Sequence, residues 1–228
     1  MSDVIGNPRQ LALALQFGEN FAREDFLAGP SNAAALDLVE RWPDWPAHVM
    51  ALVGPEGAGK SHLASILAQK AGARFISGRA IETSRVPAAL ATGALVVEDL
   101  REGAFDERAV FHLLNLAREE GASLLITTRT APVNWTVGFA DLASRIRAIP
   151  NVLLSPPDDT MLRALLVKLF ADRQLAVDES LISYVTVRIE RSFAAARVAV
   201  AELDREALRQ KRPVTRALAT ELFRTGLP

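Results

Sequence analysis

The fold of this chain is decided by the stretch Gly54-Pro55-Glu56-Gly57-Ala58-Gly59-Lys60-Ser61. It follows the apolar run 49–53, which is typical of a short buried strand, and it precedes residues 60–71, which we expect to form a helix. A glycine-rich loop that ends in Lys-Ser between a strand and a helix is the pattern of a phosphate-binding loop. The sequence therefore predicts a nucleotide-binding site at this loop rather than a turn with a chance Lys-Ser pair.

The residue types in the loop suit the chemistry of phosphate binding. Glycines allow backbone N–H groups to turn inward around phosphate oxygens, and the start of the following helix adds a partial positive charge. Lys60 would reach the β- and γ-phosphate oxygens, and the Ser61 hydroxyl would bind Mg²⁺. Two roles stay open for His62, which either contacts the nucleotide or packs at the start of the helix. We expect the nucleotide to be bound by Pro55, Glu56, Gly57, Ala58, Gly59, Lys60, Ser61 and His62.

Apolar runs alternate with helical segments along the first two thirds of the chain. Besides 49–53, the expected strands are 74–76, 94–97, 123–128 and 152–154. The expected helices begin after Asn32, an N-cap candidate, and continue at 60–71, 87–91, 107–120 and 142–146. Continuous apolar strands between helices are typical of a parallel sheet that is covered on both faces.

The pattern changes after Ser155-Pro156-Pro157-Asp158, where strand signals stop. Four helices are expected at 159–172, 178–190, 192–211 and 213–225, with Asp178 and Thr215 near two N-cap positions. The predicted fold is α/β, a five-stranded parallel sheet between helices with a small all-α C-terminal lid. We divide the chain into a leader (1–20), a nucleotide-binding domain (21–157) and the lid (158–228).

Composition excludes several other classes of protein. The chain has 228 residues, 50% hydrophobic and 23% charged, with a net charge of −1, as in a packed globular protein. Because the net charge is close to zero, we do not expect electrostatic attraction to dominate any binding to DNA or to an acidic membrane. It contains no cysteine, its three histidines lack metal-ligand spacing, and it has neither a signal peptide nor a run of membrane-spanning length. We therefore expect a cytoplasmic protein without membrane contacts.

An acid pair, Glu98-Asp99, follows the apolar run 94–97. In phosphate-loop proteins a strand end of this kind carries a Mg²⁺-binding acid and a residue that orients the attacking water. We assign Glu98, with Ser61, to the metal and Asp99 to catalysis. The alternative is a buried strand that ends in two solvated carboxylates.

These motifs together resemble the AAA+ ATPases. The resemblance rests on the phosphate loop, the acid pair, Thr127-Thr128, the segment Leu142-Ala143-Ser144-Arg145 and the all-helical end. More narrowly, residues 26–35 (Phe-Leu-Ala-Gly-Pro-Ser-Asn-Ala-Ala-Ala) are similar to the start of the ATPase core of the DnaA initiator family. That similarity implies that Leu27, Pro30 and Asn32 lie beside the adenine.

Within the DnaA clade the chain looks most like the Hda-type regulators, because of residues 139–145 and because we expect no helix-turn-helix domain after the lid. This resemblance implies that Arg145 is an arginine finger that acts in trans on a neighbouring subunit's nucleotide. The alternative reading is a surface arginine paired with Asp141, four residues earlier. Arg147 would be the next candidate for the finger.

The leader carries a second specific signal, the residues Gln10, Leu11, Leu13 and Leu15. They resemble the peptide with which proteins dock on the bacterial sliding clamp, the β subunit of DNA polymerase III. One amide would supply a polar anchor and the spaced leucines would fill an apolar cleft. The alternative is an alternating edge strand that packs on its own domain.

The function implied by the resemblance is inactivation of DnaA. Docked on the clamp, the chain would stimulate hydrolysis of DnaA-bound ATP and limit re-initiation of DNA replication. The implied partners are DnaA and the clamp, with self-association left open and DNA reached only through the clamp. The alternative is a DnaC-like helicase loader or DNA-remodelling ATPase.

Three departures from the family pattern concern the chain's own hydrolysis. Glu98 stands where the family begins its acid pair with Asp, and Arg129 stands where DnaA proteins carry an Asp sensor, with Thr128 as a partial substitute. The sensor arginine of the lid is replaced by Ala194, and Arg197 follows one turn later. We expect weak or absent hydrolysis, with ADP (or ATP) and Mg²⁺ held mainly as structural ligands.

Overall fold

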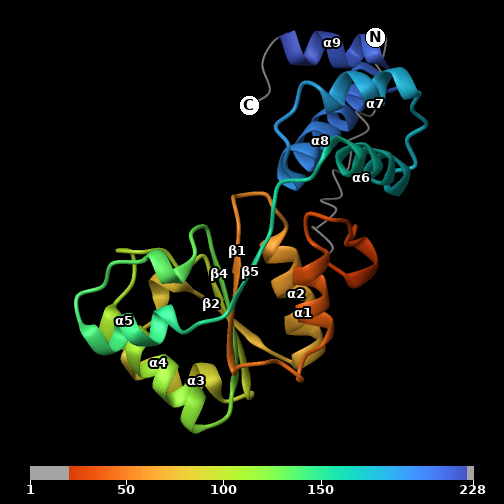
Figure 1. The fold of residues 1–228 in the computed structure, drawn as a ribbon. Coiled ribbons are helices and arrows are strands. Elements are labelled where there is room, and N and C mark those ends of the chain that lie inside the picture. Colours follow the sequence, from red (N-terminus) through yellow and green to blue (C-terminus); the bar gives the residue numbers. More distant parts are fainter. Residues whose placement is uncertain (1–20, 225–228) are drawn as a thin grey trace, which may run out of the picture.

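The computed structural model describes residues 21–224. It shows an α/β body that carries a group of helices at one end (Figure 1). The leader with Gln10, Leu11, Leu13 and Leu15 lies outside the described residues, so its clamp-docking role stays a prediction. Among the described helices, none combines the length and the hydropathy that a bilayer span requires.

The body is built on one five-stranded parallel sheet. Its strand order is β2-β3-β4-β1-β5, so the strand that leads into the phosphate loop lies inside the sheet. All strand pairs are parallel, and Val53 at the end of β1 is paired with Thr128 of β4 and Leu153 of β5. This confirms the predicted sheet. The strands are β1 (Val49–Val53), β2 (Arg74–Ser77), β3 (Ala94–Glu98), β4 (Ser123–Thr128) and β5 (Asn151–Leu153).

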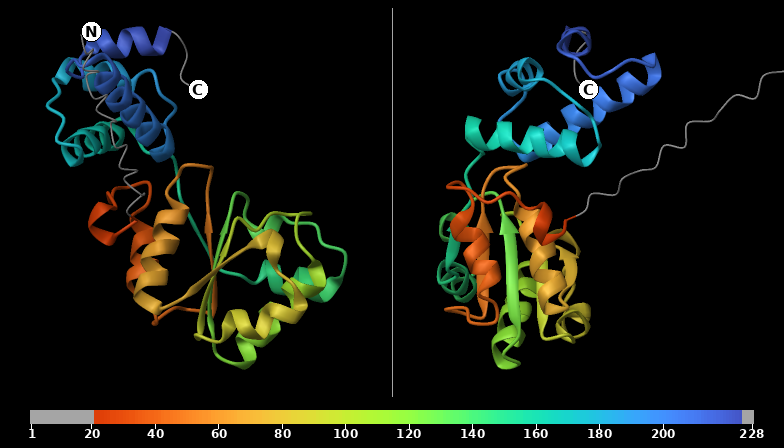
Figure 2. Two further views of the ribbon diagram at one scale, coloured as in Figure 1. Left: turned by 180° about the vertical axis from the view of Figure 1, so that it is seen from behind. Right: turned by 90° about the vertical axis from the view of Figure 1, so that its right-hand side faces the viewer.

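Helices cover both faces of the sheet (Figures 1 and 2). Met50 and Leu52 of β1 face α1 and α2, whereas Ala51 and Val53 face α3, α4 and α5. Successive residues of a strand point to opposite faces, so a strand covered on both sides must be apolar throughout. These helices are α1 (Ala33–Glu40), α2 (Lys60–Ala71), α3 (Val86–Leu90), α4 (Glu107–Glu119) and α5 (Ala140–Arg147). Short 3₁₀ turns lie at Arg23–Asp25, Gly78–Ala80, Thr83–Arg85 and Pro132–Asn134.

The C-terminal helices bury a hydrophobic cluster of their own around Phe170, which is fully buried. Their placement confirms the predicted lid, while the division at Pro156-Pro157 stays a prediction. The lid helices are α6 (Asp159–Asp172), α7 (Glu179–Thr186), α8 (Phe193–Gln210) and α9 (Arg216–Arg224).

Two lid helices, α7 and α9, differ from their predicted bounds by more than one residue at one end. Helix α7 ends at Thr186 rather than at 190, because the chain turns there and brings Ser192 to the N-cap of α8, where its hydroxyl accepts from the N–H of Ala195. Helix α9 begins after Thr215, whose hydroxyl accepts from the N–H of Leu218 at 3.3 Å. The predicted N-caps Asp178 and Thr215 are confirmed.

The expected capping role of Asn32 is wrong. Asn32 occupies the N-cap position of α1, but its side chain makes no cap hydrogen bond. Its amide Nδ2 donates to the carbonyl oxygen of Leu27 at 3.0 Å, and its Oδ1 accepts from the N–H of Gly29 at 2.9 Å. The preceding loop competes for the side chain, so Asn32 fixes the shape of residues 27–29 instead.

Candidate functional site

The phosphate loop joins β1 to α2 at the carboxyl end of the sheet. At two of its glycines there is no room for a side chain. A Cβ at Gly54 would lie 2.6 Å from the carbonyl oxygen of Leu154, and one at Gly57, whose φ is +73°, would lie 2.8 Å from Cβ of Ser192. Side chains are excluded at both points, so the loop presents backbone in a tight cradle of the kind that phosphate binding requires.

Lys60 holds this loop together from within. Its Nζ donates to the carbonyl oxygens of Gly54 at 2.8 Å and Pro55 at 2.7 Å. Burial, followed by the positive charge of Arg129, lowers the pKa of Lys60 from its ordinary value. The ammonium group therefore lies inside the cradle, where the sequence motif places a phosphate-binding charge.

A cleft of about 490 Å³ opens above the loop. It is formed by the loop, the carboxyl ends of β2, β3 and β4, and the lid, because the ends of parallel strands meet at one edge of a sheet. Of the predicted residues, the lining contains Glu56, Gly57, Gly59, Lys60, Ser61, His62, Glu98, Asp99 and Arg197. Residues that the sequence analysis did not single out for the site include Phe21, Phe75, Arg101 and Phe193. The predicted adenine contacts Leu27, Pro30 and Asn32 are not among the lining residues, and their contact with a nucleotide stays a prediction.

The metal prediction is compatible with this arrangement. Ser61 and Glu98 both line the cleft. Mg²⁺ in nucleotide sites commonly keeps waters and phosphate oxygens as ligands and takes only one or two from the protein. One hydroxyl and one carboxylate beside the phosphate loop are therefore a sufficient protein contribution.

Asp99 is bound by an arginine that the sequence analysis missed. Its backbone has φ of +54°, and its N–H donates to the Thr127 hydroxyl at 2.9 Å. Arg101 binds the Asp99 carboxylate through two contacts, Nε to Oδ1 at 2.8 Å and Nη2 to Oδ2 at 2.6 Å. The hydrogen bond from Arg101 is the main reason that the pKa of Asp99 lies below its ordinary value. Both oxygens thus face a cation, and the catalytic role of Asp99 stays a prediction.

Replacing Arg101 by Ala is expected to raise the pKa of Asp99 toward its ordinary value of 3.8. A lowered folded-state pKa stabilises the fold above the unfolded-state pKa, and this contribution is lost as the pH falls through the folded-state value. The variant should lose this contribution. Titration of the Asp99 carboxyl carbon by NMR measures the shift, with Arg108→Ala as a control of equal charge. An unchanged pKa in Arg101→Ala would contradict the assignment.

Arg129 reaches across the mouth of the cleft. It follows β4, and its Nη2 lies 2.5 Å from Oε2 of Glu56, while its Nε lies 3.9 Å from Oδ1 of Asp99. A cation thus stands at the expected sensor position. Thr127 lines the cleft in place of Thr128, whose hydroxyl donates to the carbonyl oxygen of Thr130 at 3.2 Å.

The lid contributes Arg197 from the first half of α8. Its Nη2 lies 3.3 Å from Nδ1 of His62, and Nε2 of His62 lies 2.8 Å from the carbonyl oxygen of Ala22. A guanidinium can only donate, so Nδ1 accepts and Nε2 carries the proton. His62 is buried with the rings of Phe21 and Phe26 at its edges, as the packing role requires. His62 also lines the cleft, and its contact with a nucleotide stays a prediction. Arg197 reaches the cleft, as predicted for the lid arginine, and its contact with phosphate stays a prediction.

The lid is also joined to the loop by backbone. The N–H of Phe193, at the start of α8, donates to the carbonyl oxygen of Gly57 at 2.9 Å. Together with the contact between Arg197 and His62, this bond ties the lid orientation to the conformation of the phosphate loop. Any ligand that reshapes the loop therefore acts on the lid directly.

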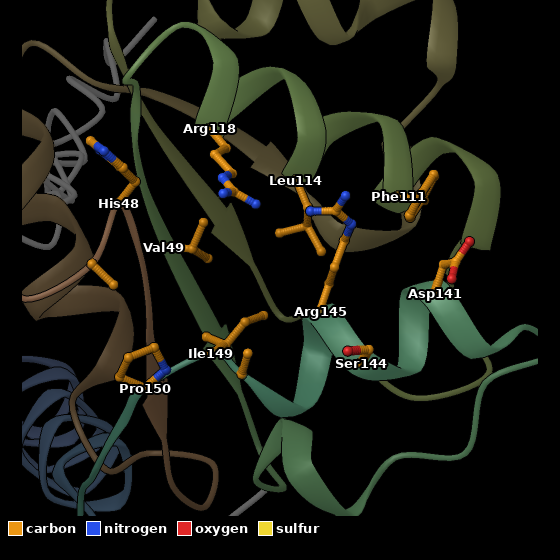
Figure 3. Close-up of a pocket in the computed structure, with 12 residues that line it drawn as sticks. His48, Val49, Phe111, Leu114, Arg118, Asp141, Ser144, Arg145, Ile149 and Pro150 are labelled. Atoms are coloured by element: carbon orange, nitrogen blue, oxygen red, sulfur yellow. The ribbon is translucent and has the colours of Figure 1, made fainter.

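Arg145 lies at the opposite end of the sheet, in a second hollow of about 740 Å³ (Figure 3). This hollow includes His48 and Val49 at the start of β1, whereas the phosphate loop follows the end of β1, about 15 Å away along the strand. The Arg145 guanidinium lies 5.2 Å from the centroid of the Phe111 ring. Within residues 21–224 no ion pair joins it to Asp141, so the alternative pairing is not formed. Arg145 is therefore remote from the chain's own nucleotide site.

Comparison with known proteins finds solved structures with a similar fold. No family model and no curated protein matches the sequence. Domain III of the Thermotoga maritima replication initiation protein DnaA superposes with a TM-score of 0.74 at 18% identity, covering 92% of this chain and 98% of that chain. This chain has the AAA+ fold. AMPPCP-bound DnaA from Aquifex aeolicus gives a TM-score of 0.66 at 16% identity, covering 84% of this chain and 67% of that chain.

The same fold extends to a second group of AAA+ proteins. The Thermotoga maritima RuvB Holliday junction branch migration motor gives a TM-score of 0.61 at 15% identity, covering 76% of this chain and 60% of that chain. The fold expected from the sequence resemblance is therefore confirmed, with its parallel sheet and its C-terminal helices.

Proposed function

We propose that this chain is a nucleotide-holding regulator that stimulates ATP hydrolysis in a DnaA-type initiator and so limits re-initiation of DNA replication. The observation that carries the proposal is the place of Arg145. Its guanidinium has no carboxylate partner among the described residues and lies at the end of the sheet opposite the chain's own phosphate loop. From that place Arg145 is remote from the chain's own phosphate loop, so an action on phosphate requires a nucleotide held by another molecule.

The residues of the cleft fit a nucleotide of the chain's own. The cradle at Gly54 and Gly57 and the ammonium of Lys60 would hold the phosphates, and Ser61 and Glu98 would hold Mg²⁺. Bound ADP would supply negative charge between loop and lid. Because Arg101 binds Asp99, we infer that the nucleotide is mainly a structural ligand. Denaturing extraction of the purified protein identifies whether ADP or ATP is held.

In the partner's nucleotide site, Arg145 would act on the phosphoryl group during its transfer. A guanidinium stays charged at any physiological pH and offers forked donors, so it stabilises charge on a phosphoryl group in transfer. The Arg145 guanidinium lies over the Phe111 ring and the side chain is half-buried, so it is partly desolvated. The partner supplies the nucleotide, its metal ion and the attacking water.

The leader would dock the protein on the sliding clamp. The leucines at 13 and 15 would fill an apolar cleft on the clamp, with Gln10 and Leu11 beside them. Replacing Leu13 and Leu15 together by Ala is expected to reduce retention on immobilised clamp to background. The matched control replaces Val4 and Ile5, which lie in the same leader outside the docking residues. Retention unchanged by the first pair of substitutions would contradict the docking role.

The test of the function is release of labelled phosphate from ATP-loaded DnaA in the presence of DNA-loaded clamp. Addition of this protein is expected to accelerate the release. If the rate stays unchanged, while the protein hydrolyses ATP itself and binds single-stranded DNA, the function is that of a helicase loader or a DNA-remodelling ATPase.

A further inference from the structure

The hollow that contains Arg145 holds a second arginine. Arg118 lies near the end of α4, and Arg145 lies in the last turn of α5. Figure 3 shows both guanidinium groups entering the same space from these two helices. The hollow is also lined by His48 and Asp141 and by the apolar residues Val49, Leu114 and Ile149.

Within the described residues, no neighbouring carboxylate neutralises the positive charge of either arginine. Among residues 21–224 neither Arg118 nor Arg145 forms an ion pair with a carboxylate, although Asp141 lines the same hollow. The neighbouring arginine of the helix, Arg147, is exposed and does not line it. A cation in the last turn of a helix is favoured by the helix dipole, which accounts for one arginine at each helix end. The helix dipole does not explain why two different helices place their arginines in the same hollow.

The chemistry of the hollow fits a phosphate group. Two forked donors suit several oxygens of one tetrahedral anion, and guanidinium groups bind phosphates through paired hydrogen bonds. Apolar walls reduce the screening of the two charges by water. Arg118 is exposed and Arg145 is half-buried, so an anion that approaches from outside meets Arg118 first.

We propose that Arg118 is a second phosphate-binding residue, which together with Arg145 binds the polyphosphate of a nucleotide held by the partner subunit. This inference rests on the proposed function and adds a division of roles. Arg118 binds phosphate oxygens in the ground state, and Arg145 acts on the charge that develops as the phosphoryl group is transferred. The pocket is therefore a receptor for the partner's nucleotide and not for a nucleotide of this chain.

The two roles predict different kinetic signatures. An interaction made equally in the ground and transition states changes affinity, whereas one made only in the transition state changes the maximal rate. Arg118→Ala is expected to raise the concentration needed for half-maximal stimulation of phosphate release by roughly tenfold to a hundredfold, the range of one charge-assisted contact. The maximal rate at saturation should change much less than it does in Arg145→Ala.

The experiment measures phosphate release from ATP-loaded DnaA against the concentration of the wild type, Arg118→Ala and Arg108→Ala. Arg108 lies on the same helix, is exposed and does not line the hollow, so it controls for loss of one charge from α4. Unfolding temperature and ADP binding of each variant show whether Arg118 merely supports the helix end. Half-maximal concentrations that are equal for Arg118→Ala and Arg108→Ala would overturn the inference and leave the function standing.

Binding of each variant to nucleotide-free and to ATP-loaded DnaA separates a phosphate from a carboxylate as the ligand. We expect Arg118→Ala to weaken binding only to the ATP-loaded form. Equal weakening for both forms would mean that Arg118 contacts acidic side chains of the partner, which also overturns the inference. Absence of stimulation by the wild type is a different result, because it removes the proposed function and this inference with it.

Discussion

Replacing Arg145 by Ala is expected to abolish most of the acceleration of phosphate release from ATP-loaded DnaA. The variant keeps the phosphate loop and the lid contacts, which lie at the other end of the sheet, and loses the Arg145 side chain beyond Cβ, including its guanidinium. Fingers in related phosphoryl-transfer systems contribute on the order of 10³-fold or more to the rate. The measurement is the maximal rate at saturating concentrations of the variant, where weaker association no longer limits the signal.

The controls for this prediction come from the same helix. Arg147→Ala removes an exposed arginine that does not line the hollow, and it should stimulate nearly as well as the wild type. Arg145→Lys keeps the charge without the fork and tests whether the planar geometry is needed. Loss of stimulation in Arg147→Ala, with full stimulation in Arg145→Ala, would move the finger to Arg147.

Replacing Gly57 by Ala is expected to weaken nucleotide binding by roughly tenfold to a hundredfold, because overpacking of this kind costs about 1–3 kcal/mol. Its φ of +73° is strained for alanine, which costs roughly 1–2 kcal/mol. In addition, the new Cβ would lie 2.8 Å from Cβ and 3.0 Å from Oγ of Ser192, whose hydroxyl caps α8. The Ser192 side chain cannot move away without losing its hydrogen bond at the start of α8. The phosphate loop and the lid must therefore separate to make room for the new Cβ. Titration with a fluorescent ADP analogue measures the affinity.

Gly72 provides the matched control for this substitution. It also has a positive φ, +61°, but a Cβ there meets nothing within 4 Å. Gly72→Ala should therefore lose stability through backbone strain alone and bind nucleotide as the wild type does. Equal affinities for Gly57→Ala and the wild type would show that the lid need not stay against the loop.

Helices and strands could be predicted correctly where a single local sequence signal determined the structure. Strands β1 and β4 and helix α2 match their predicted bounds, because continuous apolar runs and the glycine-rich loop leave few alternatives. Errors arose where two local signals competed. Asn32 has a capping side chain, but the carbonyl of Leu27 and the N–H of Gly29 bind it first. At the end of α7 the turn toward Ser192 outweighs a helical pattern that continues to 190.

The phosphate loop and the acid pair followed from short stretches of sequence, because their geometry depends on neighbouring residues and on the start of one helix. The other contacts of the site join residues that are far apart in the chain. Glu56 meets Arg129 and His62 meets Arg197 only because the sheet and the lid bring strand ends and helix starts together. Arg101, although close in sequence, binds Asp99 through a left-handed backbone whose N–H is bound by Thr127 of the next strand. Such contacts depend on distances set by packing, which no pattern of spacing encodes.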